Sequence, residues 1–479
     1  MPDFIQPCHS SFVVKAPQVS VNSGNKTADF SGSSHHPFLK TDLPSTRLTE
    51  QSDIADSNSI KISHRHVSVN KASPHSLLTL TEAQDFPPIP EGPSFLLLFP
   101  EEHLFLLFAD PDAIISRCSP QEYEAREPKC TSAWCRGMSQ VLDWIQHDPV
   151  DSPLISRRRY MQINYLLTDG VDNMLSSHIP GATRKGSVFY GSKDHTHKGV
   201  IQALEYKQRL EENYEFCRGT RNATIVLCSK SRTIPDSTLI WVHNHKNQYP
   251  NYTNLEGVTI RFRTLGPDNS ESGETTSDDI LFKYQLLVLL EKEIIIPLNR
   301  KLKSLQNRAI AKPELLEELI NILAKYWPRL EQIHPSTDGT CRTNYMLMQY
   351  IFMKFGFPPP VLRDPNSIDL VHTSLCKRII GIGLQNSLRL MEQKDQVLEA
   401  AAIVDRYTTR YLKKSACFFL CGQDYEKYLI PDELNFSDQY IAQMRHLTKE
   451  FIEVLNQFRT SAHKHSRLQK TPLHIRKKS

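Results

Sequence analysis

The sequence is poor in glycine and in net charge. It has 18 glycines against 30 prolines among 479 residues, and its formal charge is only +4. The small net charge excludes a dedicated, strongly basic nucleic-acid binder, so we expect no specific nucleic-acid partner. The many prolines and the modest hydrophobic content of 39% indicate that part of the chain forms no packed core. The remaining length suffices for two or three compact units.

The sequence also lacks a long hydrophobic run. Its most apolar stretch, 95–109, is interrupted by four residues from Pro100 to His103. Neither half approaches the ~20 residues that cross a bilayer, so we predict a buried β-hairpin there and no transmembrane segment. The first residues lack a positively charged start followed by an apolar run. We therefore expect no secretory signal and a cytoplasmic location.

The ten cysteines include no CxxC pair. In a chain without a visible secretory signal, reduced thiols are expected. Histidines recur in three His-x-His pairs, at 195/197, 243/245 and 463/465. Because no cysteine or carboxylate lies at a diagnostic spacing from them, these pairs do not predict a zinc site.

The sequence divides into five parts, and its predicted fold class is mainly α. Residues 1–85 lack Trp and Tyr and show no sustained apolar periodicity, which predicts a disordered arm. Residues 86–250 mix helical and strand patterns, which predicts a smaller α+β region of unknown role. Helical periodicity dominates 251–410 and continues in C-terminal helices at 411–458. The basic tail, 459–479, has seven Lys or Arg and no acid, so the rest of the chain carries about −3; the tail is suited to contact an anionic surface.

Secondary structure follows from the spacing of apolar residues. In the α+β region we predict helices at 134–145, 159–175 and 200–214 and strands at 187–191, 224–228 and 238–242. In the helical half, one helix begins near Asp279 and ends at Pro297, and Pro313 begins the next. The segment 345–355 is apolar almost all round, which predicts a helix buried on every side. Further helices are predicted at 374–393, 396–411 and 438–458.

A short polar loop between two of these helices carries the candidate chemistry. Gly339 permits unusual backbone dihedrals, and the amides of Gly339, Thr340 and Cys341 lie at the start of the following helix. Such a helix N-terminus favours anions by geometry and dipole. Arg342 adds a planar fork of donors for phosphate oxygens.

Two further residues complete the predicted site. Asp338 is a hard oxygen ligand of the kind that holds Mg²⁺ together with substrate phosphates. His334 titrates near neutral pH and is suited to take a proton from an attacking hydroxyl. An anion cradle, a metal-binding carboxylate and a general base within nine residues predict a phosphoryl- or nucleotidyl-transfer site.

This loop resembles the signature of the Fic (Fido-fold) family, H-P-F-x-D/E-G-N-G-R. It reads HPSTDGTCR from His334 to Arg342, and a buried helix closing with GFPP follows it. The resemblance covers about residues 250–410, for which it implies a Fic-like helical domain. Within this range, Gly257–Gly266 resembles the β-hairpin flap with which the family aligns its target segment.

The resemblance implies an activity and a set of roles. Fic enzymes mostly transfer AMP from ATP to a hydroxyl side chain of a target protein. Carried over, His334 is the general base, Asp338 binds Mg²⁺, Gly339 lies in the anion nest and Arg342 holds the nucleotide phosphates. The implied cofactors are ATP, or another nucleotide, and Mg²⁺, and the implied partner is a protein with an exposed Ser, Thr or Tyr.

Three positions depart from the family pattern, since Ser336 replaces Phe, Thr340 replaces Asn and Cys341 replaces Gly. A Thr hydroxyl can donate one hydrogen bond, so we predict an active but divergent enzyme. The predicted arm and the lack of a secretory signal fit an effector that a bacterium injects into a host cell. The alternatives are a catalytically degenerate Fic-like scaffold and a transferase with its site in 160–250. In that region Gly181–Ser187 has the glycine spacing of a P-loop but not its lysine.

Overall fold

The structure of the chain, a computed structural model, describes most residues beyond 91. These are 92–116, 118–149, 152–172, 174, 178–185, 189–191, 197–217, 225–229, 233–234, 258–263, 277–368, 371–392, 394–414, 428–431 and 434–469. The predicted disordered arm, 1–85, lies outside the described residues. The prediction of a mainly helical fold is confirmed.

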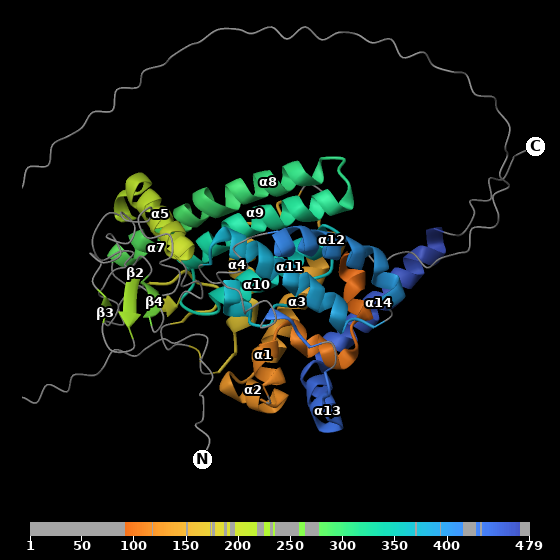
Figure 1. Cartoon of the computed structure of the whole chain (residues 1–479). Helices are drawn as coiled ribbons and strands as arrows, with labels where there is room; N and C mark the ends of the chain where they lie inside the picture. The colour runs from red at the N-terminus through yellow and green to blue at the C-terminus, as the bar shows by residue number, and fades with distance from the viewer. Residues whose placement is uncertain are drawn as a thin grey trace, which may run out of the picture. The chain divides into compact units, whose positions relative to one another are not determined.

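The core is built around α10 (Thr340–Lys354), which contacts α3 (Cys130–His147), α4 (Arg157–Thr168) and α9 (Lys312–Ile333). Figure 1 shows α10 surrounded by these helices. Nearly all of its side chains are buried, as predicted for a segment that is apolar all round. Each large apolar side chain buried in this way contributes about 1.5–3 kcal/mol to stability. Helices from both sides of residue 250 therefore share one core.

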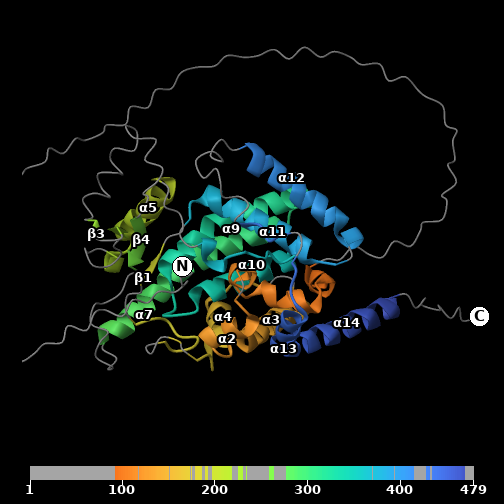
Figure 2. The same ribbon diagram turned by 60° about the horizontal axis from the view of Figure 1, so that its bottom comes forward.

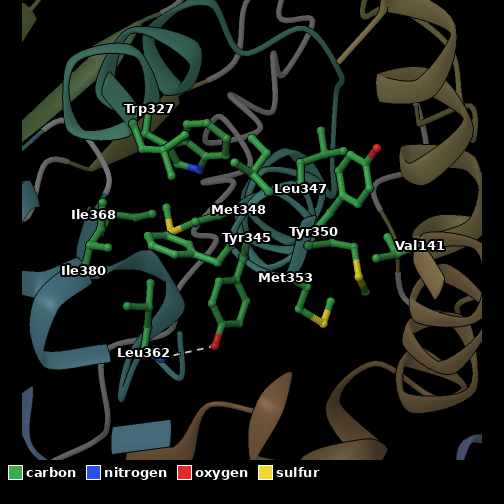
Figure 3. Packing of buried hydrophobic residues seen from close by; sticks show 14 of the residues in the cluster. Val141, Trp327, Tyr345, Leu347, Met348, Tyr350, Met353, Leu362, Ile368 and Ile380 are labelled. Carbon is green, nitrogen blue, oxygen red and sulfur yellow. Dashed lines mark hydrogen bonds between the residues drawn. The ribbon is translucent and has the colours of Figure 1, made fainter. Parts of the chain in front are cut away.

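The proline-rich segment that follows α10 is held against it by a buried tyrosine (Figure 3). The hydroxyl of Tyr345 donates to the carbonyl of Pro360 at 3.0 Å and accepts from the N–H of Leu362 at 3.1 Å. Buried hydroxyls normally need such partners, because an unpaired polar group in a core costs free energy. The chain consequently turns back along α10 before it enters α11 (Thr373–Leu390).

Helix α9 brings the chain to the candidate loop. As predicted, Pro313 lies in its first turn, where the missing N–H needs no partner. The apolar stripe from Leu316 to Leu330 is buried, including Trp327. Pro328 lies inside the helix without ending it, and the helix stops at Ile333, immediately before the loop.

Two local predictions are wrong. The predicted hairpin at 95–109 is a pair of 3₁₀ helices, η1 (Gly92–Leu98) and η2 (Glu101–Leu107). A short continuous apolar run fits a buried strand or a buried helical turn equally well, and here Leu104 to Leu107 are all buried in the core.

The chain also continues through Pro297, which was predicted to end a helix. Helix α7 (Ser277–Leu290) passes through a π-helical turn, η4 (Glu291–Ile295), into α8 (Ile296–Gln306). Pro297 lies in the first turn of α8. The widened turn before it accommodates the missing N–H, so the proline marks a change of helix type and not an end.

The strands form one antiparallel sheet in the order β1-β4-β2-β3. Its members are β1 (Phe189–Gly191), β2 (Ile225–Ser229), β3 (Thr233–Ile234) and β4 (Val258–Arg263). The predictions for 187–191, 224–228 and 200–214 are confirmed, the last as α5 (His197–Asn213), whereas 238–242 lies outside the described residues. The described part of the predicted flap is β4, a central strand that pairs with β1 and β2 and forms no separate hairpin.

The remaining helices complete the fold (Figure 2). They are α1 (Pro111–Ile115), α2 (Pro120–Arg126), η3 (Glu215–Cys217), η5 (Pro365–Ile368), η6 (Lys394–Val397), α12 (Leu398–Lys414), α13 (Asp438–Leu447) and α14 (Lys449–Gln469). The last predicted helix is thus two helices, and α14 includes the first part of the predicted basic tail. No described helix has the length and apolar character needed to cross a membrane.

Candidate active site

The predicted loop connects α9 to α10, and it begins with a strained residue. We divide it into a first half, residues 334–336, and a second half, residues 338–342. His334 has φ 45° and ψ 69°, a left-handed conformation that non-glycine residues rarely adopt. Its place before Pro335 also disfavours continued helix, because a proline ring crowds the residue before it. Strain of this kind persists only where the surroundings hold it.

Arg184, from a segment between α4 and β1, holds this strained turn. Its Nε donates to the carbonyl of His334 at 2.6 Å, and its Nη2 donates to the carbonyl of Ile333 at 3.2 Å. Its backbone N–H donates to the carbonyl of Pro335 at 2.9 Å. The side chain is 1% exposed, and its guanidinium lies 5.2 Å from the ring centre of Phe282. A cation at the C-terminal end of α9 satisfies the last carbonyls and complements the helix dipole.

The environment of His334 determines its protonation state. Burial, together with the charge of Arg184, lowers the pKa of His334 to about 3, and a hydrogen bond with the backbone carbonyl of Glu331 opposes this shift. The imidazole is therefore neutral at pH 7, the form that accepts a proton. A base of such low pKa holds a proton weakly, and an anion bound beside the ring would raise its pKa.

A buried polar network lies one helical turn before the loop. The side-chain amide of Asn344 donates to the carboxyl of Glu331 and accepts from the hydroxyl of Tyr160 at 2.9 Å. The indole of Trp327 donates to the backbone carbonyl of Asn344 at 3.2 Å. Burial raises the pKa of Glu331 to about 7, although the Asn344 hydrogen bond acts in the opposite direction. The network joins α9, α10 and α4 directly beneath the loop.

The second half of the loop is positioned by α4. Gly339 has φ 70°, and an added Cβ would lie 2.4 Å from Cγ2 of Thr168. The side chain of Asn164 donates to the carbonyl of Asp338 at 3.1 Å and to the hydroxyl of Thr343 at 3.2 Å. Glycine is required here both for the left-handed backbone and for the close approach of α4. The N-terminus of α10, which favours anions, consequently has a fixed position.

Two predicted phosphate-binding residues turn their side chains elsewhere. Thr340 is 1% exposed, and its hydroxyl donates to the carbonyl of Ser336 at 3.3 Å and interacts with Tyr160. It therefore does not replace the family's Asn amide in this conformation, and its backbone amide is what remains for an anion. Cys341 is half-buried, and its thiol donates to the carbonyl of Pro365 at 3.6 Å.

Asp338 and Arg342 lie together, beside a histidine that the sequence analysis did not select. Burial disfavours the charge of Arg342, but the carboxylates of Glu127 and Asp338 outweigh this cost and raise its pKa. Nη2 of Arg342 pairs with Glu127 at 2.6 Å, whereas Nη1 is buried and has no acceptor among the described residues. Burial lowers the pKa of His178, an effect that Asp338 opposes and Arg342 reinforces. Both ring nitrogens of His178 are buried without a partner in the described part of the chain.

The structure thus groups the predicted residues in two sets. The charges of Asp338 and Arg342 both act on His178, while Arg184 and Glu331 shift the pKa of His334. The sequence analysis missed Asn164, Arg184 and His178 because no local pattern links them to the loop. Arg184, for example, is 150 residues from His334, in a segment whose glycines resemble those of an ordinary turn.

Asp338 is the one carboxylate of the loop, and its Oδ1 accepts from the N–H of Gly339 at 2.7 Å. Proteins commonly bind Mg²⁺ through one or two carboxylates plus substrate phosphates. A single carboxylate whose charge acts on Arg342 would suit a metal–nucleotide complex, in which Asp338 would hold the metal and Arg342 a phosphate. Among the described residues, no group of three or more His, Cys, Asp or Glu is arranged to hold a metal by itself.

No protein-family model matches the sequence, and no curated protein matches it. The resemblance to the Fic family therefore depends on the loop residues and on the helices around them.

Proposed function

We propose that the chain transfers AMP from ATP to a hydroxyl side chain of another protein, as its resemblance to the Fic family implies. The observation that carries this proposal is that the charge of Asp338 acts on Arg342 at the N-terminus of α10, where Nη1 of Arg342 is buried without an acceptor among the described residues. Phosphate oxygens are the acceptors that a guanidinium binds best. The helix N-terminus adds its own preference for anions.

In the proposed reaction, the hydroxyl oxygen of a target Ser, Thr or Tyr attacks the α-phosphorus of ATP. A new oxygen–phosphorus bond forms, the bond between this phosphorus and the bridging oxygen of the β-phosphate breaks, and pyrophosphate leaves. His334 takes the hydroxyl proton, for which its neutral imidazole is suited. Mg²⁺, when bound, supplies neutralisation of the phosphate charge. Arg342 binds a phosphate, and the contacts of Arg184 keep the backbone of His334 in place.

Two observations favour a second candidate, a Fic-like protein that binds a partner without catalysis. The hydroxyl of Thr340 is directed into the core, and Arg342 already pairs with Glu127. Removing one donor that is tuned to a transition state costs about 2.7–4 kcal/mol, or roughly 10²–10³ in rate. If the chain is an enzyme, we therefore expect it to be slower than an enzyme with the full Fic motif.

The test is transfer of label from α-phosphate-labelled ATP to proteins of a lysate in the presence of Mg²⁺. The variants are His334→Ala and Arg342→Gln, and His147→Ala is the control because this histidine is exposed and pairs with Asp143 within α3. We expect label on a protein band with the wild type and His147→Ala, and its loss with the other two. Labelling in eukaryotic lysates only would support an effector that acts in a host cell.

The outcomes separate the two candidates. Equal labelling by wild type and His334→Ala would exclude His334 as the base. Absence of transfer from any labelled nucleotide, with retained nucleotide binding that depends on Arg342, would favour the binding protein. Because the pKa of His334 is about 3, protonation of this base should not reduce kcat/KM of an active enzyme between pH 7 and pH 5.

A further inference from the structure

Four cations from α5, α8 and α9 form a cluster that includes none of the residues assigned to the active site. It consists of Arg209 on α5, Lys301 on α8, and Lys325 and Arg329 on α9. Lys325 and Arg329 are four residues apart on one helix and so share a face. Burial lowers the pKa of Lys325, and the charges of Arg329, Lys301 and Arg209 lower it further. The four groups are therefore close enough to repel one another.

Tyr206 of α5 holds the two guanidinium groups of this cluster. The guanidinium of Arg209 lies 5.4 Å from the centre of its ring, and that of Arg329 lies 5.2 Å from it. The ring is 4% exposed, and its hydroxyl has no hydrogen-bond partner among the described residues. An aromatic face attracts cations, so the ring holds both planar donor groups near it.

Among the described residues, Arg209 is the one member of the cluster with a carboxylate partner. Glu293 pairs with Arg209 and accepts from the hydroxyl of Tyr214 at 2.8 Å. No described carboxylate forms an ion pair with Lys301, Lys325 or Arg329. Burial lowers the pKa of Arg329 as well, with Arg209 adding to the effect. Folding brings these charges together at a free-energy cost that a bound anion would remove.

We propose that this cluster is a binding site for a small anion that carries a chain of phosphates. Arginine forks match phosphate oxygens with two parallel hydrogen bonds, and lysines add point charges. Three cations without a carboxylate partner among the described residues favour a ligand with several negative charges, which a phosphate chain supplies better than a single phosphate. Arg329 is half-buried beside Tyr206, which favours a small ligand over a lipid surface.

The site goes beyond the proposed function, although one helix connects the two. Arg329 lies five residues before His334, and α9 ends between them in the strained turn. The groups of the cluster and those around Asp338 share no residue. Binding at the cluster therefore depends on neither His334 nor Arg342, and each site can be tested while the other is altered.

The test measures binding of inorganic tripolyphosphate to the full chain by titration calorimetry and by the shift in melting temperature. We expect binding that weakens with added salt. Lys325→Gln combined with Arg329→Gln should reduce affinity by about tenfold or more. The control is Arg157→Gln with Arg158→Gln, which removes the same charge from exposed positions at the start of α4. The control pair should bind as the wild type does, and Arg342→Gln should retain the binding that the Lys325/Arg329 substitution removes.

Several outcomes would overturn the proposal. The first is equal binding of tripolyphosphate by the Lys325/Arg329 variant and the wild type. The second is an equal loss of affinity in the control pair. The third is a loss of affinity in Arg342→Gln alone, which would place the anion in the loop. The absence of binding by the wild type would also overturn the proposal. Without ligand, the Lys325/Arg329 variant should melt at or above the wild-type temperature, because its charge repulsion is relieved, so lost binding cannot be attributed to unfolding. Comparison of tripolyphosphate with ATP identifies the class of ligand. Equal affinity for the two indicates an inorganic phosphate chain, and a preference for ATP indicates a nucleotide.

Discussion

The two halves of the candidate loop are built in opposite ways. In the first half, Arg184 engages the carbonyls of His334 and Pro335, and Ser336 is completely buried. In the second half, Asp338 and Arg342 are half-buried, Nη1 of Arg342 has no acceptor among the described residues, and both charges act on His178. The difference indicates that the first half fixes the position of the loop and the second half is where a charged ligand fits. Substitutions in the two halves should therefore affect different properties.

The largest effect should come from removing Arg184. Arg184→Met keeps much of the side-chain volume but removes the donors to Ile333 and His334. Each buried carbonyl left without a donor costs about 1–3 kcal/mol, which chemical denaturation would measure as a lower free energy of unfolding. The same change removes a charge that lowers the pKa of His334, so NMR titration should show this pKa rising toward its ordinary value.

Arg342→Gln is the matched comparison in the second half. Its ion pair with Glu127 is part-exposed, with side chains 25% and 35% accessible. Pairs of this kind contribute about 0–1 kcal/mol, so stability should change little while nucleotide binding is lost. A comparable loss of stability in both variants would contradict the division of the loop into a positioning half and a binding half.

The next effect tests the contact between the second half and α4. Gly339→Ala places a Cβ against Thr168 in a left-handed backbone, and we expect a loss of about 2–3 kcal/mol from conformational strain and overpacking. Thr168→Ser removes the methyl group that the Cβ would meet but keeps the hydroxyl that donates to the carbonyl of Asn164 at 2.7 Å. The double variant should regain the overpacking part only. Strict additivity in chemical denaturation would show that the methyl is not the obstacle.

Local sequence patterns predicted the helices on either side of this site but not the contacts that hold the loop in place. The apolar stripe of α9 and the apolar segment of α10 lie within single helices, so their spacing alone located the loop. Arg184 and Asn164 reach the loop from 150 and 174 residues away, a separation that no local pattern encodes. The orientation of Thr340 was also beyond prediction, because it depends on a carbonyl of the folded loop.

The same limit explains the errors elsewhere in the fold. The stretch 95–109 is apolar without a period, and its 3₁₀ helices form because the surrounding helices bury all of its sides. Pro297 has the sequence signature of a helix end, but the π-helical turn before it allows the chain to continue. In both cases tertiary contacts determine the local structure, and they override the preference of the local sequence.

Two buried groups beside the first half predict opposite pH dependences. Burial raises the pKa of Glu331 from 4.5 to about 7, so the folded chain binds the extra proton and stability falls as pH rises from 4.5 to 7. Burial lowers the pKa of His334 from 6.5 to about 3, so stability falls as pH drops below 6.5. Glu331→Gln should therefore gain stability relative to wild type as pH rises through this interval, by about 3 kcal/mol at pH 8. Denaturation at several pH values measures the difference.

His334→Gln is the counterpart and should behave in the reverse sense. It should gain stability relative to wild type as pH falls from 6.5, because the unfolded wild type gains a proton that its folded state excludes. Parallel pH profiles of wild type and both variants would show that neither group is held in the state described above.

The smallest expected effect is a gain of stability in the first half itself. The hydroxyl of Ser336 is fully buried and has no partner among the described residues, at the position where the family has an apolar anchor. Ser336→Ala removes this unsatisfied group and should raise the free energy of unfolding by about 1 kcal/mol. Ser387→Ala is the matched control, because that buried hydroxyl donates to the carbonyl of Pro359 and its removal should cost about 1 kcal/mol. If both variants lose stability, the Ser336 hydroxyl has a partner in solution, and the first half of the loop contributes more than position to the site.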